Sequence, residues 1–135
     1  MASKDNATRS IVLNYLLRAE EDANPPVDWT LELYNGDPLG AGTVVSGTGY
    51  TGQAIDFEKS GGGASSGGAN LQNTAQIDFT CNEDVDWDVV DYVAVKDDQG
   101  RLLYTGALSA SVDLSSTHPQ TTIRFAAGAV VCSES

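Results

Sequence analysis

The chain has 135 residues, of which 19 are acidic and seven are basic, so its formal net charge is −12. A charge of this sign repels nucleic-acid phosphates, and no lysine or arginine cluster overrides it, so we expect no direct nucleic-acid partner. A hydrophobic fraction of 41% excludes a disordered chain and is sufficient for one packed domain.

The longest apolar stretches, 11–13 and 126–131, are far shorter than the roughly 20 residues that span a bilayer. The first residues are polar and mixed in charge, unlike a signal peptide. We therefore expect a soluble protein that is made in a cytosol-like compartment and has no membrane partner. Two cysteines, Cys81 and Cys132, are either reduced buried thiols or a disulfide between the C-terminal strand and the middle of the sheet.

The first twenty residues carry the one predicted helix. Apolar side chains recur there at helical spacing, at Val12, Tyr15, Leu16 and Ala19, with Ile11 and Leu17 widening the stripe. Asn24-Pro25-Pro26 then forces an extended exit. The sequence thus predicts a helical arm over residues 1–24, which either packs across one end of the sheet or docks on a neighbouring subunit.

From residue 25 onward the sequence alternates between apolar and polar residues, as β-strands do. The expected strands are Trp29–Tyr34, Thr51–Phe57, Ala75–Cys81, Tyr92–Lys96, Leu102–Ala107, Thr121–Phe125 and Ala129–Cys132. Asp97-Asp-Gln-Gly100 reads as a hairpin turn. These patterns predict an all-β fold, a single compact antiparallel β-sandwich or barrel over residues 25–135, preceded by the short N-terminal α-helix.

Two glycine-rich segments resemble ligand-binding loops only in part. Gly47-Thr-Gly49-Tyr-Thr-Gly52 has the letters of a dinucleotide motif, but a strand pattern follows it instead of a helix. Ser60–Gly68 lacks the Gly-Lys-Ser/Thr of a phosphate-binding loop, and we expect an exposed flexible loop that a partner subunit orders. The sequence therefore predicts no cofactor.

The densest acidic cluster runs from Glu83 to Asp91 and begins like a calcium loop, with Asp84-x-Asp86-x-Asp88. Val89 stands where that loop needs glycine, and Val95 stands where it needs glutamate. A bound cation and a pair of glycosidase carboxylates are alternatives, but we favour solvated aspartates with Trp87 and its apolar neighbours pointing inward.

His118 is the single histidine, no G-x-S-x-G motif accompanies it, and a loop histidine before proline is typical of a surface residue. We therefore predict no metal site, no catalytic residues and no enzymatic activity. Aromatic residues at strand positions are usually core, so we favour burial for Trp87, Tyr92 and Tyr104, with a sugar-stacking platform as the alternative.

Several blocks together resemble a family of small bacteriophage virion proteins, described as tail-fibre-like. The blocks are Tyr15-Leu-Leu17, Leu31-Glu-Leu-Tyr34, Asp37-Pro38, Ser46-Gly-Thr-Gly-Tyr50, Gln53–Phe57, Trp87–Val95, Leu102–Ala107 and Ile123–Gly128. The resemblance covers most of residues 11–131 and implies a non-enzymatic structural protein of the virion.

Within such a virion, the compact acidic domain and the absence of a coiled-coil or β-helical repeat favour a capsid cement or decoration protein. This interpretation places the chain on the capsid exterior, bound to the major capsid protein and to itself as a homotrimer. The alternative is a tail or tail-fibre component with carbohydrate or receptor binding. The predicted partner interface consists of Ile11, Val12, Tyr15, Leu16, Ser60, Gly61, Gly62 and Gly63.

Overall fold

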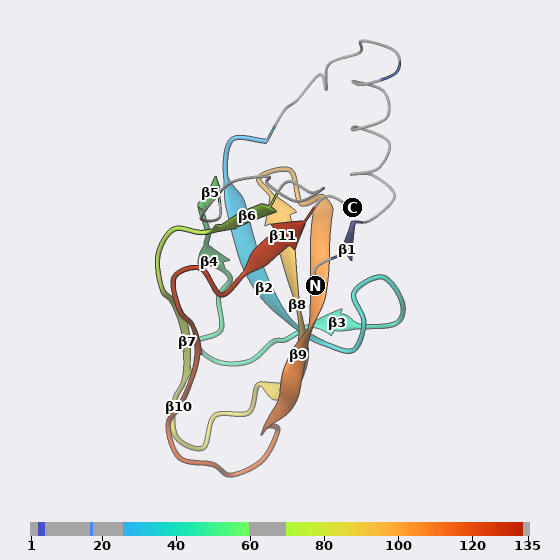
Figure 1. Cartoon of the computed structure of the whole chain (residues 1–135). Helices are drawn as coiled ribbons and strands as arrows, with labels where there is room; N and C mark the ends of the chain where they lie inside the picture. Colours follow the sequence, from blue (N-terminus) through green and yellow to red (C-terminus); the bar gives the residue numbers. More distant parts are fainter. Residues whose placement is uncertain (1–2, 5–16, 18–25, 60–69, 134–135) are drawn as a thin grey trace.

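The computed structural model describes residues 3–4, 17, 26–59 and 70–133. Within 26–59 and 70–133 every regular element is a β-strand (Figure 1). The strands are β1 (Ser3–Lys4), β2 (Trp29–Asn35), β3 (Thr43–Val44), β4 (Gln53–Ala54), β5 (Phe57–Lys59), β6 (Asn70–Asn73), β7 (Ile77–Cys81), β8 (Asp88–Asp97), β9 (Leu102–Leu114), β10 (Thr121–Phe125) and β11 (Val131–Ser133). Among the described residues, no helix has the length and apolar character that crossing a membrane requires.

The largest sheet has the strand order β1-β9-β8-β2-β3, with β4 also paired to β2, and every pair is antiparallel. Leu31 and Leu33 of β2 lie opposite Val95 and Val93 of β8. Both leucines are fully buried, whereas Glu32 between them is half-buried on the opposite face. The alternation in the sequence therefore places one face of this sheet in the core, as predicted.

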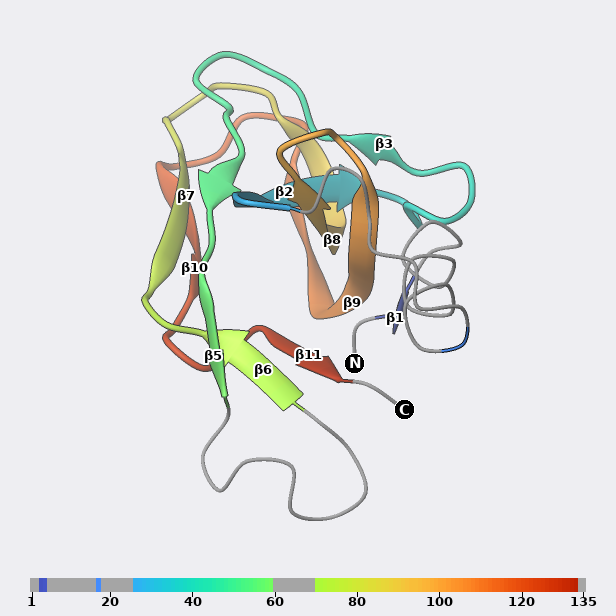
Figure 2. The ribbon, with the colours of Figure 1, turned by 90° about the horizontal axis from the view of Figure 1, so that it is seen from above.

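Two smaller antiparallel sheets, β7–β10 and β5–β6–β11, complete the fold. Seen from above, they stand across from β2, β8 and β9, and the three sheets surround one interior (Figure 2). Buried side chains from all three sheets meet there. They are Leu31, Leu33, Val45, Ile55, Ile77, Phe79, Cys81, Trp87, Val90, Val95, Leu114, Ile123 and Cys132. The predicted antiparallel β-architecture is confirmed for the described residues.

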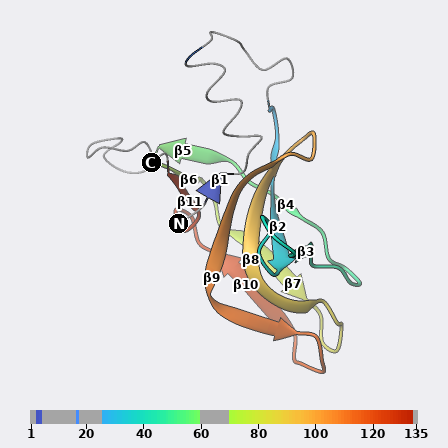
Figure 3. The same cartoon turned by 90° about the vertical axis from the view of Figure 1, so that its right-hand side faces the viewer.

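Strands β8 and β9 form one long curved hairpin (Figure 3). Its turn is the predicted one, in which Gly100 has φ 78° and donates its N–H to the Asp97 carbonyl at 3.1 Å. Farther along the hairpin, the register shifts: Tyr92 of β8 pairs with Ala107 of β9, but Val90 pairs with Val112. Residues 108–111 of β9 lie between these two registers, so the strand bulges there and resumes beyond the predicted end at Ala107.

The prediction of one strand over Thr51–Phe57 is wrong. Strand β4 ends at Ala54 in the large sheet, and β5 begins at Phe57 in a different sheet. Between them Ile55 is buried and donates its N–H to the Trp29 carbonyl at 3.1 Å. The alternation is continuous because the side chains keep facing one interior while the backbone crosses from one sheet to the next.

The predicted N-terminal helix lies outside the described residues except for Leu17, which is helical and exposed. Near the start of the chain, Ser3 and Lys4 pair with Thr105 and Tyr104 and extend the large sheet at β9. The division into an arm over 1–24 and a domain over 25–135 stays a prediction.

Candidate functional site

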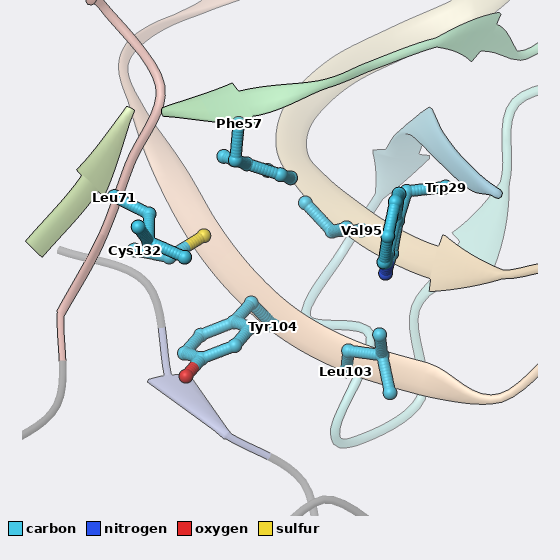
Figure 4. Close-up of a pocket in the computed structure, with 7 residues that line it drawn as sticks. All are labelled: Trp29, Phe57, Leu71, Val95, Leu103, Tyr104 and Cys132. Carbon is cyan, nitrogen blue, oxygen red and sulfur yellow. The ribbon is translucent and has the colours of Figure 1, made fainter. Parts of the chain in front are cut away.

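A cavity of about 500 Å³ opens between the large sheet and the β5–β6–β11 sheet (Figure 4). Strands β2, β8 and β9 form one wall, and β5, β6 and β11 form the other. The lining residues are Trp29, Val95, Leu103 and Tyr104 on the first wall and Phe57, Leu71 and Cys132 on the second. The cavity therefore lies between side chains of these two sheets.

A second depression of about 250 Å³ continues along β9. It shares Val95, Tyr104 and Cys132 with the first cavity. From there it follows β9 as far as Ser109 and is closed on the other side by Phe125 and residues 129–132. We call the two depressions together the apolar groove. A groove of this size and composition suits the binding of apolar groups.

The described lining of the apolar groove offers no charged catalytic side chain. No acidic, basic or histidine residue is among the described residues that line it. Burial raises the pKa of the Cys132 thiol to about 11, so the thiol stays protonated near neutral pH and is a poor nucleophile. The described lining of the groove is therefore suited to binding apolar groups.

The acidic cluster lies elsewhere, in the connection between β7 and β8 and at the start of β8. As predicted, Trp87 points inward and is 2% exposed, while Asp84, Asp86 and Asp88 are exposed. The Asp86 carboxylate accepts the Asp88 N–H at 3.1 Å, and the Asp88 carboxylate accepts the Val89 N–H at 2.8 Å. These carboxylates shape the turn, and no group of three His, Cys, Asp or Glu residues in the described part of the chain is arranged to hold a metal ion.

The favoured interpretation, burial in the core, is confirmed for Trp87, and the three aromatic rings do not form the single surface that the sugar-stacking alternative requires. Trp87 is buried, donates its indole N–H to the Thr48 carbonyl at 2.8 Å and packs edge-on against Tyr50. Tyr104 pairs with Val95 on the core-facing side of the large sheet, and Tyr92, three residues before Val95, lies on the opposite side. The sugar-binding function therefore loses its candidate site.

His118 has a structural role that the sequence did not reveal. Its Nε2 lies 2.7 Å from the Val85 carbonyl oxygen, and its Nδ1 lies 2.6 Å from the Pro119 carbonyl oxygen. Carbonyl oxygens only accept hydrogen bonds, so both contacts are satisfied when both ring nitrogens carry a proton. These bonds, to Pro119 first and Val85 second, raise the pKa of His118. The half-buried His118 ring ties the loop before β10 to the loop after β7.

Both cysteines are free and buried, as one of the two sequence interpretations held. The Cys81 thiol donates to the Val85 carbonyl at 3.2 Å, and burial, followed by the charge of Asp86, raises its pKa. The predicted partner interface lies outside the described residues. It comprises Ile11, Val12, Tyr15, Leu16 and Ser60 to Gly63.

Comparison with known proteins supplies the family. A family model described as "Podophage GP4 fiber I protein gp80" matches residues 3–133, nearly the whole chain. No curated protein matches the chain, and no solved structure does.

The family match confirms the resemblance to phage virion proteins and the prediction that the chain is not an enzyme. It also corrects the favoured interpretation: the family is one of fibre proteins, so it supports the tail-fibre alternative over the capsid cement. The chain is a phage virion component that belongs to the podophage GP4 fiber I protein gp80 family.

Proposed function

We propose that this chain is a structural subunit of the phage tail fibre and acts by binding other virion chains. The observation that carries the proposal is the match to a fibre family over residues 3–133. The apolar groove supports it, because the described residues that line it are mostly apolar and none is acidic, basic or histidine, a composition that suits assembly. We therefore propose that the chain is located in the fibre and not on the capsid exterior.

For the architecture, we propose that the three sheets act as one small β-sandwich or barrel. The support is their shared core, to which Leu33 of β2, Phe79 of β7 and Cys132 of β11 all contribute. A single core makes a rigid unit that can be repeated along a fibre.

The expected contact with the major capsid protein followed from the cement interpretation and has no support of its own. The homotrimer stays a prediction. For a fibre subunit, the partners to examine first are other copies of this chain and the neighbouring fibre proteins.

The proposal can be tested with a phage in which this reading frame is interrupted. The purified particles should have filled heads but lack the fibre in negative-stain images, and supplying the chain in trans should restore it. Particles with complete fibres and heads that leak DNA would overturn the proposal.

A further inference from the structure

Strand β2 ends at Asn35, which begins the single Asn-Gly pair of the chain, Asn35-Gly36. Gly36 has φ 86°, and a Cβ at this position would lie 3.0 Å from the Cα of Gly42, so the turn after β2 requires glycine. Asn35 is held as well, because its Nδ2 donates to the Val89 carbonyl of β8 at 2.9 Å. The fold therefore places a side-chain amide directly before a residue that has no Cβ.

Asparagine before glycine is the pair most open to deamidation, because no side chain shields the backbone nitrogen that follows the asparagine. In this reaction the Gly36 nitrogen loses its proton and attacks Cγ of Asn35. A bond forms between these two atoms, the bond from Cγ to Nδ2 breaks, and ammonia leaves with the proton. Water then opens the succinimide ring to aspartate or isoaspartate, so the net change consumes water and releases ammonia.

Both reacting groups are bound to β8 in the folded chain. The Gly36 N–H donates to a carboxylate oxygen of Asp91 at 2.7 Å, and Asn35, Gly36 and Asp91 are all half-buried. The charge of Asp91 disfavours loss of the Gly36 proton, because the nitrogen would become an anion beside a carboxylate. The bond from Nδ2 to Val89 ties the side-chain amide to β8, so rotating the side chain costs this bond.

We propose that Asn35-Gly36 is a deamidation site whose reaction β8 holds back, through Asp91 at the attacking nitrogen and Val89 at the leaving amide. The reaction would weaken the link between β2 and β8. An aspartate at position 35 has no N–H for the Val89 carbonyl, and it places a negative charge where Nδ2 now lies 3.5 Å from the Asp88 carboxylate. The site thus joins a slow hydrolytic change to the stability of the large sheet, and it does not depend on the fibre role.

The test follows the deamidated fraction of the peptide that carries Asn35, by mass spectrometry, while the purified full-length chain is incubated in mildly alkaline buffer. The natural chain is compared with Asp91→Ala and with Asp91→Asn, which keeps an acceptor oxygen but removes the charge. Asp56→Ala, at an exposed position between β4 and β5, is the matched control. Asn73→Ala controls for a general loss of stability, because the Asn73 side chain holds the connection between β10 and β11. The natural chain in urea gives the rate without the fold.

We expect deamidation to be fastest in urea and slowest in the folded natural chain. Asp91→Ala should raise the rate in the folded chain by about tenfold, the factor that a hydrogen bond to a charged group supplies, and Asp91→Asn should raise it by less. Asp56→Ala should react like the natural chain, and Asn73→Ala should react more slowly than Asp91→Ala.

A folded Asp91→Ala chain that deamidates no faster than the natural chain would overturn the proposal, and a slower one would make Asp91 the base that takes the Gly36 proton. If Asp91→Ala does not fold, Asp91→Asn is judged by the same criterion. An Asn73→Ala chain that reacts as fast as Asp91→Ala would also overturn it, because instability alone would then set the rate.

The consequence for the sheet is tested with Asn35→Asp, which carries the product side chain. Asn82→Asp is its control, because it adds the same charge at an exposed position. Asn35→Asp should lower the urea midpoint of unfolding, and Asn82→Asp should leave the midpoint nearly unchanged. Equal midpoints of the two variants would overturn the link between deamidation and the stability of the sheet.

Discussion

The hydroxyl of Tyr50 accepts the backbone N–H of Leu33 at 2.9 Å, in a gap along the edge of β2. On this edge β4 pairs with Leu31 and β3 pairs with Tyr34, so neither strand reaches the N–H of Leu33. The Leu33 carbonyl accepts the Val45 N–H at 2.9 Å. The Tyr50 side chain thus replaces one of the backbone hydrogen bonds that a neighbouring strand would make to β2. Burial raises the pKa of the Tyr50 hydroxyl, so the hydroxyl stays protonated.

We expect Tyr50→Phe to destabilise the protein by about 1–3 kcal/mol, the usual cost of an unpaired buried polar group. The ring should keep its contacts with Phe79 and Trp87, so the loss reports on the hydroxyl alone. Tyr92→Phe, at a half-buried position, is the control. Urea unfolding measures both, and an equal stability of the two variants would contradict this account.

A second prediction concerns Asn73, which is 1% exposed and holds the connection between β10 and β11. Its Nδ2 donates to the carbonyls of Ala75 at 2.8 Å and Ala126 at 3.1 Å, and its Oδ1 accepts the Val130 N–H at 2.9 Å. Asn73→Ala leaves three partly buried backbone groups without their partner, and we expect a loss of about 1–3 kcal/mol. The exposed Asn82→Ala should change the free energy of unfolding by no more than about 0.5 kcal/mol. If Asn73→Ala lowered the free energy of unfolding as little as Asn82→Ala does, the three hydrogen bonds of the Asn73 side chain would contribute little to stability.

A third prediction uses two glycines of the loop before β4. A Cβ at Gly47 would lie 2.3 Å from the Asp86 carbonyl oxygen and 2.7 Å from Trp87 Cδ1, whereas a Cβ at Gly49 would meet nothing within 4 Å. Both have positive φ, 154° and 79°, so both alanine variants are strained in the backbone. Gly47→Ala adds a steric clash, which we expect to cost about 1–3 kcal/mol more than Gly49→Ala. Thermal unfolding of the two variants compares these costs, and equal midpoints would refute the close approach of Gly47 to Trp87.

A fourth prediction is a pH dependence from His118. Hydrogen bonds to Pro119 and Val85 raise its pKa in the folded state, so its contribution to stability is complete below the unfolded pKa of 6.5. That contribution should disappear as the pH rises through the higher folded pKa. Urea midpoints between about pH 6 and pH 9 should therefore decline in the natural chain.

The decline should be absent in His118→Gln, because His118 is the single histidine of the chain. An NMR titration of the imidazole would check the direction of the pKa shift. A folded-state pKa below 6.5 would mean that the two carbonyl contacts do not hold a doubly protonated ring.

Local patterns predicted much of the fold. The alternation from Trp29 to Tyr34 and the run Thr121–Phe125 became strands β2 and β10, and the turn before Gly100 forms as expected. These elements are predictable because a strand with one buried face must alternate, and because a tight turn needs a residue that tolerates positive φ.

Other elements depend on partners that are distant in the sequence. Three of the four residues of strand β6 (Asn70–Asn73) are polar, and the strand forms because β5 and β11 pair with it on either side. The apolar groove joins Trp29, Leu71 and Tyr104, which no local pattern connects. The same limit applies to His118, whose role follows from the carbonyl of Val85 in another loop. The residue types alone predicted that the chain is not an enzyme. The apolar groove, in contrast, could be identified only from the three-dimensional arrangement of the strands.

The central claim is that the chain is a fibre subunit, and the most direct measurement is its location and copy number in purified particles. Labelled-antibody electron microscopy combined with quantitative mass spectrometry would give both. The account predicts label confined to the tail fibres and a copy number that is a small multiple of the fibre number. Label spread over the head, at a copy number comparable to that of the major capsid protein, would contradict it.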